Sequence, residues 1–282
     1  MKPILLCTDL DRTLIPNGVQ PVSSNAMARF KQLARRPEIT LVYVSGRDRG
    51  LIEQAIIEFD LPQPDFAIAD VGSTIYQVKN TEWQQWDEWD KHIAVDWQGL
   101  SALALLELLK DIPALTLQEQ TKQNHHKLSF YVPLATNLET LSHIIYAQFL
   151  SAGIKANLIW SIDEILKVGL LDVLPASANK LHAINFLMQQ LRVTQDRALF
   201  AGDSGNDLDV LVSDISAVLV ANADSEVRRL VSHANKDKLY ISQGNYLGMN
   251  GNYSAGILEG TAHFFPEIDT WLRTMSETHS KG

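Results

Sequence analysis

The chain has 282 residues, of which 46% are hydrophobic and 20% charged, and its formal net charge is −9. This composition is typical of a globular protein with one large domain or two ordinary ones, long enough to bury a sizeable core. A field of negative sign repels phosphate backbones and anionic lipid surfaces, so we expect neither nucleic acid nor membrane as a partner.

The sequence also favours a reducing compartment. The single cysteine, Cys7, cannot form an intramolecular disulfide. The apolar run at 4–8 is too short for a signal-peptide core, and no later run approaches the length of a membrane span. We therefore expect a cytoplasmic protein, and the absence of heptads or an apolar exposed stripe favours a monomer.

Strands and helices alternate through the first 80 residues. Short apolar runs at 4–8, 39–44 and 66–69 predict strands buried on both faces, and helical spacing predicts helices over 24–33 and 49–59. The alternation predicts a parallel α/β sheet. Each strand run ends in polar or glycine residues, and ligands bind at the carboxyl ends of such strands.

The pattern changes between residues 81 and 174. A predicted helix over 92–109 and the alternating strand 127–132 are typical of an α+β unit with a half-solvated antiparallel sheet. The α/β pattern then returns. We therefore predict a Rossmann-like parallel-sheet core formed by 1–80 and 175–282, with 81–174 inserted as an α+β domain and hinges near Asn80 and Pro175.

Several reactive side chains follow predicted core strands, and Lys180 opens a predicted helix. An aspartate after a strand is usually a turn former or a helix cap, so each residue alone says little. Together, however, their carboxylates would repel one another strongly unless a cation lay among them. Oxygen ligands of this kind suit Mg²⁺, which also accepts substrate phosphate and water. The set is Asp9, Asp11, Ser45, Lys180, Asp203 and Asp207.

These residues belong to four ordered motifs. The motifs resemble those of the haloacid dehalogenase superfamily in their order, their residue types and their spacing. The insertion resembles the α/β (type IIB) cap of members that act on phosphorylated sugars. The motifs are Asp9-Leu10-Asp11-Arg12-Thr13, Ser45-Gly46-Arg47, Lys180 and Gly202-Asp203-Ser204-Gly205-Asn206-Asp207.

The resemblance implies a role for each acid. Asp9 would be the nucleophile that forms an aspartyl-phosphate, and Asp11 the general acid and then the general base. Asp203 would hold Mg²⁺ together with Asp9 and the main-chain carbonyl of Asp11. Asp207 would orient Lys180 or bind the metal through water.

The remaining motif residues would contact the substrate. Ser45 and Lys180 would hold the transferring phosphoryl group, whose transition state is stabilised mainly by positioning and charge. Two positions depart from the usual pattern: Arg12 stands where most of the superfamily has glycine, and Ser45 where threonine is common. Ser45 keeps the hydroxyl group that threonine would supply. We expect neither departure to abolish the activity of the protein.

A softer resemblance links the chain to sucrose-6-phosphate phosphatases. It implies hydrolysis of sucrose 6-phosphate, supplied by a sugar-phosphate synthase, with sugar or phosphate contacts from Ser45, Gly46, Arg47, Ser73, Lys127 and Asn206. The segments that carry it are 45–47, 71–76, 127–131 and 254–260.

Other functions stay open. A different glycosyl phosphate, such as mannosylfructose or glucosylglycerol phosphate, would use the same chemistry, and a sugar phosphomutase would use the same aspartate nucleophile. A non-catalytic sugar-phosphate-binding module is the third alternative. Such a module has no need of both Asp9 and Asp11 beside a metal site, so the intact set argues against it.

Aromatic and imidazole groups in the insertion have simpler interpretations. Trp83, Trp86 and Trp89 recur every three residues, which favours a packing face over a sugar platform. The pair His125-His126 has no carboxylate or cysteine at metal-ligand spacing, so we expect it to face solvent.

Overall fold

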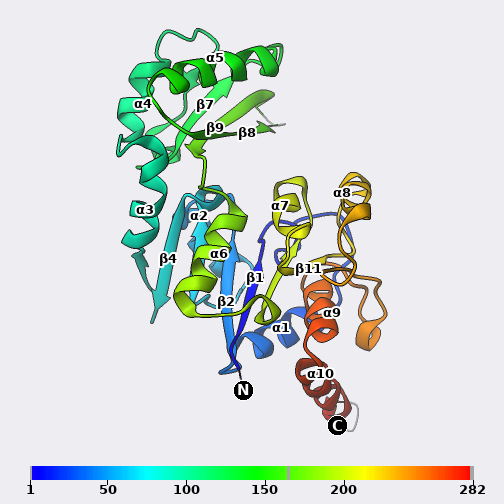
Figure 1. Ribbon diagram of the computed structural model, residues 1–282. Helices are drawn as coiled ribbons and strands as arrows, with labels where there is room; N and C mark the ends of the chain where they lie inside the picture. Colours follow the sequence, from blue (N-terminus) through cyan, green and yellow to red (C-terminus); the bar gives the residue numbers. More distant parts are fainter. Residues whose placement is uncertain (1, 164–165, 280–282) are drawn as a thin grey trace.

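The computed structural model describes residues 2–163 and 166–279. It has two lobes, the larger in the lower part of Figure 1 and the smaller above it at the upper left. The larger lobe is built on an eight-stranded sheet and the smaller on a four-stranded sheet. Across the described residues, no helix is both long enough and apolar enough to cross a membrane.

The eight-stranded sheet is parallel except at one side. Its strands from β12 to β3 pair in parallel, and β4 and β5 add to β3 as antiparallel strands. The order is β12 (Leu239–Ile241), β11 (Ser216–Leu219), β10 (Ala198–Gly202), β1 (Ile4–Thr8), β2 (Ile39–Val44), β3 (Phe66–Ala69), β4 (Thr74–Lys79) and β5 (Glu82–Gln85). The predicted parallel α/β core is therefore confirmed.

Strand β1 lies at the centre of this sheet, and all five of its residues are buried. Its side chains alternate between two hydrophobic cores, with Leu6 in one and Leu5 and Cys7 in the other. Burial raises the pKa of the Cys7 thiol above its usual value. The continuous apolar run follows from this double burial, since neither face of the strand meets water.

Helices cover both faces of the sheet. One core includes side chains of α1 (Ala26–Ala34), α2 (Arg49–Glu58), α9 (Ser254–Phe264) and α10 (Pro266–His279). The other includes side chains of α6 (Lys180–Leu191), α7 (Leu208–Leu211) and α8 (Ser225–Leu230).

The smaller lobe has a core of its own. Its antiparallel sheet runs in the order β6 (Thr116–Leu117), β7 (Leu128–Val132), β9 (Val168–Pro175) and β8 (Ala156–Asp163). Helices α4 (Ala102–Leu109) and α5 (Leu138–Ser151) pack against one face of this sheet and bury Trp97, Phe130 and Phe149. Helix α3 (Asp87–Ala94) leads from the larger lobe into the smaller one (Figure 1).

Two elements differ from the sequence-based expectation. The helix predicted over 92–109 is broken, because Gln98 and Gly99 adopt left-handed backbone conformations between α3 and α4. Strand β5 falls within the range 81–174 yet pairs with β4 in the core sheet. Asn80 and Thr81 form the intervening turn with φ of 50° and 70°, so the hairpin keeps the chain on the larger lobe until residue 85.

Candidate active site

The predicted site residues gather where the central parallel strands end. Asp9 follows β1, Ser45 follows β2 and Asp203 follows β10, three strands that are neighbours in the sheet. Thr8 is in register with Tyr43 on one side and Ala201 on the other, so the ends of the strands are level. The sheet therefore brings residues almost 200 positions apart to one edge.

Lys180 is the buried cation of the site. Its Nζ lies 2.8 Å from Asp9 Oδ1 and 2.7 Å from Asp207 Oδ1, and donates to Asn206 Oδ1 at 3.2 Å. Asn179 fixes the start of α6 by accepting a hydrogen bond from the His182 amide. Burial lowers the pKa of Lys180, but the carboxylates of Asp207 and Asp9 outweigh it, so the net shift is upward and the ammonium stays charged.

Two of the carboxyl groups are hard to ionise without a further cation. Burial raises the pKa of Asp9 to about 7, with Lys180 opposing the rise and Asp207 adding to it. Burial and the charge of Asp207 raise the pKa of Asp203 to about 6. A cation placed among these oxygens would favour both ionised forms.

The oxygen atoms present fit a divalent metal. Asp9, Asp203 and Asp207 each offer a carboxylate oxygen, and these atoms lie within 4.8 Å of one another. Asp203 Oδ1 accepts a hydrogen bond from Thr13 at 3.2 Å, whereas its buried Oδ2 has no hydrogen-bond partner among the described residues. An all-oxygen donor set with one unpaired buried oxygen suits a hard cation such as Mg²⁺.

Asp207 is held by the main chain. Its Oδ2 accepts hydrogen bonds from the amides of Asp203 and Ser204 at 3.1 and 3.2 Å, while Oδ1 contacts Lys180. The loop is compact here, because a Cβ on Gly202 would lie 2.6 Å from the Asp207 carboxylate. Asp207 is therefore placed to position Lys180 and Asp203.

Asp11 lines the same site and is paired with Arg47. Arg47 Nε and Nη2 donate to the two carboxylate oxygens at 2.8 and 2.6 Å, and Asn17 donates to Oδ1 at 2.7 Å. Burial raises the pKa of Asp11, but the hydrogen bonds and charge of Arg47 outweigh it, so the net shift is downward. The Arg47 amide also donates to Ser45 Oγ at 3.1 Å.

These groups surround a cavity of about 360 Å³. Lys180 and Asp207 are buried next to it, 3% and 0% exposed, and are not among its lining residues. A second cavity of about 370 Å³ shares Asn206 with the first and is bounded by Lys180 and by strand β8 of the smaller lobe. The first cavity is lined by Asp9, Asp11, Arg12, Ser45, Gly46, Arg47, Leu51, Asp203, Ser204 and Asn206.

Two residues predicted to bind sugar lie elsewhere. Lys127 is buried, and its Nζ lies 3.0 Å from Asp70 Oδ1 on the core loop after β3. Ser73, on the same loop, accepts a hydrogen bond from Asn124 at 3.3 Å. In this structure both connect the two lobes. Asp70 was not among the predicted site residues, although its position after β3 matches the pattern of the other strand ends.

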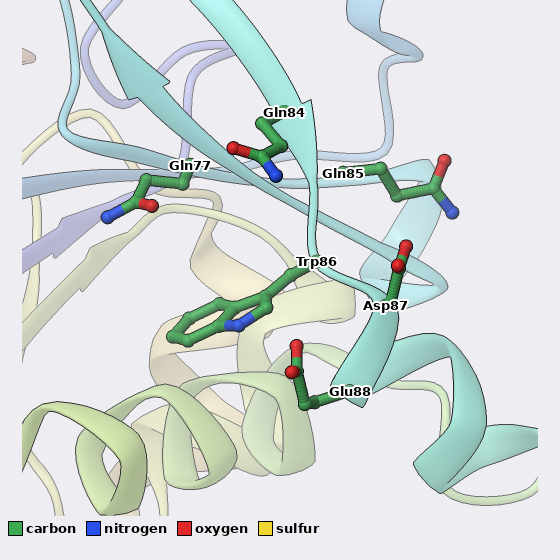
Figure 2. Close-up of a pocket in the computed structure, with 6 residues that line it drawn as sticks. All are labelled: Gln77, Gln84, Gln85, Trp86, Asp87 and Glu88. Atoms are coloured by element: carbon green, nitrogen blue, oxygen red, sulfur yellow. The ribbon is translucent and has the colours of Figure 1, made fainter.

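The tryptophans pack against the core lobe, but they share no single face as their spacing predicted: Trp86 and Trp89 pack against one hydrophobic core and Trp83 against the other. Trp86 stacks on Phe66 with ring centroids 5.5 Å apart, and Trp89 is buried and donates to the Gly72 carbonyl at 3.0 Å. Figure 2 shows the indole ring of Trp86 extending toward a helix below the strand. Its ring centroid lies 5.9 Å from that of Phe186 in α6, so it anchors the start of α3 to the core lobe.

The prediction for the histidine pair holds for His125 and is wrong for His126. The side chain of His125 is 61% exposed, whereas that of His126 is 2% exposed. The turn folds back because the His126 amide donates to Asn124 Oδ1, and the His126 Nδ1 atom then lies 2.8 Å from Asp90 Oδ1 on α3. The carboxylate partner comes from a distant segment, which local spacing could not reveal.

A parallel sheet with this arrangement of acids and lysine at its carboxyl edge, and with an inserted α+β lobe, defines a phosphatase of the haloacid dehalogenase superfamily. Residues 2–265 match the model of the sucrose-6F-phosphate phosphohydrolase family. The chain belongs to this family, and it is accordingly a phosphoric monoester hydrolase.

Individual relatives agree with this placement. The chain is 51% identical over 280 residues to a putative haloacid dehalogenase-like hydrolase of Nitrosococcus oceani, covering 98% of this chain and 76% of that protein. It is 30% identical to the mannosylfructose-phosphate phosphatase of Agrobacterium fabrum, covering 94% and 98%. It is 27% identical to sucrose-phosphatase 1 of Nicotiana tabacum, covering 93% of this chain but 59% of that protein.

The fold has a solved counterpart. The sucrose-phosphatase of Synechocystis, determined in complex with sucrose and phosphate, superposes with a TM-score of 0.73 at 25% sequence identity. The match covers 94% of this chain and 98% of that one, so both lobes are included.

Proposed function

We propose that the protein hydrolyses a sugar phosphate monoester with the help of Mg²⁺ and through an aspartyl-phosphate intermediate, with sucrose 6-phosphate as the first candidate substrate. One observation carries the proposal: the buried Asp9 carboxylate has one oxygen engaged by Lys180 and lies at a cavity that also presents Ser45, Arg47 and Asp203. The names of the relatives support a glycosyl phosphate as the substrate.

The first step is attack on phosphorus by Asp9. Lys180 engages Oδ1 of Asp9 and we assign the attack to Oδ2. As the new O–P bond forms, the bond from phosphorus to the sugar oxygen breaks, and Asp11 delivers a proton to that oxygen. Ser45 Oγ accepts a hydrogen bond from the Arg47 amide, so its own proton is available to a phosphoryl oxygen.

The second step is hydrolysis of the acyl phosphate. Asp11, now deprotonated, accepts a proton from a water molecule whose oxygen attacks phosphorus, and the Asp9–phosphorus bond breaks to release phosphate. Asp9 and Asp203, with the main-chain carbonyl of Asp11, would hold Mg²⁺, which neutralises charge on the transferring phosphoryl group. Asp207 positions Lys180 and the loop that carries Asp203.

The inserted lobe acts as a cap in this proposal. The sugar would extend from the first cavity past Asn206 into the second, which is bounded by β8 of the smaller lobe. Closure of the lobe over the core would exclude water during the first transfer. Sugar contacts from Ser73 and Lys127 stay a prediction that requires them to leave their partners Asn124 and Asp70.

A second candidate is a different glycosyl phosphate. The 30% identity to a mannosylfructose-phosphate phosphatase, over almost the whole of both chains, favours testing that compound beside sucrose 6-phosphate. The match to a phosphohydrolase family supports hydrolysis rather than mutase chemistry. The cytoplasmic location, the monomeric state and a synthase that supplies the substrate stay predictions.

Phosphate release from a panel of disaccharide, glycosylglycerol and monosaccharide phosphates tests the proposal. We expect the highest kcat/KM with sucrose 6-phosphate, loss of activity in EDTA and its return with Mg²⁺. An isomeric sugar phosphate with little free phosphate would instead identify a mutase. No turnover of any panel member with added Mg²⁺ would overturn the proposal.

A further inference from the structure

Arg12 has a backbone conformation that disfavours it. Its φ is 59°, in the left-handed region where a side chain is strained and glycine is not. Two asparagines hold this conformation: Asn17 accepts a hydrogen bond from the Arg12 amide at 2.8 Å, and Asn222 donates to the Arg12 carbonyl. Strained residues cluster at functional sites, so the contacts of the Arg12 side chain are relevant to function.

The side chain reaches the proposed metal site. Arg12 Nε lies 3.4 Å from Asp203 Oδ2, and neither atom has a hydrogen-bond partner in the part of the chain that the structure describes. Since Thr13 already donates to Oδ1, Oδ2 is the oxygen of Asp203 left for a cation. The guanidinium of Arg12 and a divalent metal would therefore compete for the same oxygen.

A second acid holds the other end of the guanidinium. Arg12 Nη2 donates to Asp224 at 2.9 Å, and the Asp224 side chain is 59% exposed. Asp224 lies outside the group of carboxylates that can share a metal. Asp224 can therefore remain paired with Arg12 when Asp203 binds a metal ion.

Charge explains why the competition matters. Asp9, Asp203 and Asp207 lie close together, and one buried ammonium, Lys180, pairs with Asp9 and Asp207, so two negative charges remain when all three acids are ionised. Arg12 supplies one positive charge to the cluster and lowers the attraction that a metal would feel.

We propose that Arg12 is a built-in counter-ion for Asp203, which a divalent metal must displace toward Asp224, and that it thereby sets the metal concentration the protein requires. The inference rests on the metal site of the proposed function. Arg12 acts on the metal through Asp203 and is a positioning residue.

Metal binding by the full chain tests this directly. Mn²⁺ is the probe, and the electron paramagnetic resonance signal of free Mn²⁺ reports binding without any substrate. We expect Arg12→Gln to bind Mn²⁺ roughly two- to fivefold more tightly than the parent, the range for a partly exposed ion pair. Arg12→Gly should do the same without backbone strain, and Arg12→Lys, which keeps the charge, should stay near the parent.

A double-mutant cycle sharpens the test. Asp224→Asn should weaken Mn²⁺ binding, because Arg12 then loses its alternative partner and pairs more strongly with Asp203. The same change should have no effect in the Arg12→Gln background. The Arg12→Gln gain should shrink at high ionic strength. Lys110→Gln, a distant surface change of the same charge, is the matched control and should leave the affinity unchanged.

Three results would overturn the proposal. Unchanged or weaker Mn²⁺ binding in both Arg12→Gln and Arg12→Gly removes the counter-ion role. Weaker binding of inorganic phosphate with unchanged Mn²⁺ affinity would make Arg12 a phosphate ligand instead. Full Mn²⁺ binding by Asp203→Asn would show that the metal site itself is misplaced, and that the error lies in the proposed function.

Discussion

Arg47 holds both carboxylate oxygens of Asp11, with Nε 2.8 Å from Oδ2 and Nη2 2.6 Å from Oδ1. The pairing keeps the ionised form of Asp11, because the Arg47 contacts outweigh burial and lower its pKa. A general acid must be protonated, so in the proposed reaction Arg47 has to release Asp11 before the first proton transfer. Arg47 lines the first cavity, and in the proposed reaction a substrate phosphate would be a competing partner for its guanidinium.

Arg47→Met should therefore change the pH profile as well as the affinity. Activity that needs protonated Asp11 declines as pH rises above the pKa of that group, and loss of Arg47 raises this pKa. We expect the alkaline limb of kcat/KM to move to higher pH and KM to rise. Arg49→Met, two residues away and paired with Glu53, is the control. An unshifted alkaline limb would show that Arg47 does not control the protonation of Asp11 during catalysis.

Asp9→Asn should abolish turnover and leave the fold intact. Asparagine has almost the same shape, and Lys180 keeps Asp207 as its charged partner, so no buried charge is stranded. We expect kcat to fall by at least about a thousandfold, as for the loss of a nucleophile. Circular dichroism and thermal melting check the fold, and substantial residual activity would contradict the nucleophile assignment.

Metal should stabilise the protein more at neutral than at acidic pH. The folded-state pKa values of Asp9 and Asp203, about 7 and about 6, lie above the ordinary value of 3.8. The folded state then binds protons more tightly than the unfolded state, so protonation of these two acids stabilises the fold. Without metal, this contribution is complete below about pH 4 and is lost as pH rises through 6 to 7. A dication removes the repulsion that remains when both acids are ionised.

Thermal melting in EDTA and in Mg²⁺, at pH 5 and pH 8, measures this difference. We expect the gain in Tm on adding Mg²⁺ to be several degrees larger at pH 8. Asp203→Asn should reduce that gain. Equal gains at both pH values would count against a metal held by these carboxylates.

The buried pair Lys127–Asp70 should be important for stability. The two side chains are 8% and 9% exposed and connect the smaller lobe to the loop after β3. Lys127→Met leaves the Asp70 carboxylate buried without its cation, which for such pairs costs about 3–5 kcal/mol in free energy of unfolding. Urea unfolding measures the loss, and adding Asp70→Asn should recover part of it. A change within experimental error would mean that water already reaches the pair.

The gathering of Asp9, Ser45 and Asp203 at one edge of the sheet was predictable because it follows from their positions at the ends of parallel strands. Asp9, Ser45 and Asp203 each stand directly after an apolar run, and parallel strands place such residues together. The burial of His126 against Asp90 was not predictable, since their contact joins a turn to a helix 36 residues away. The pairing of Lys127 with Asp70 was not predictable for the same reason, since the two residues are far apart in the sequence.

The boundary of the insertion depended on a turn without a clear signature. Asn80 and Thr81 both take positive φ, and the sequence lacks the glycine that usually marks such a hairpin. Strand β5 is therefore assigned by its pairing with β4, which a local pattern of mixed polar residues does not encode.

Cys7, two residues before Asp9 in the central strand, is fully buried and is the one cysteine of the sequence. A thiol reagent can reach it only when β1 separates from its neighbours or from the helices that cover it. The rate of labelling under native conditions therefore measures the opening of the strand that leads into Asp9, with no need to introduce a cysteine by mutation. Comparing that rate with and without a bound phosphate would report how strongly ligand binding holds the centre of the sheet closed.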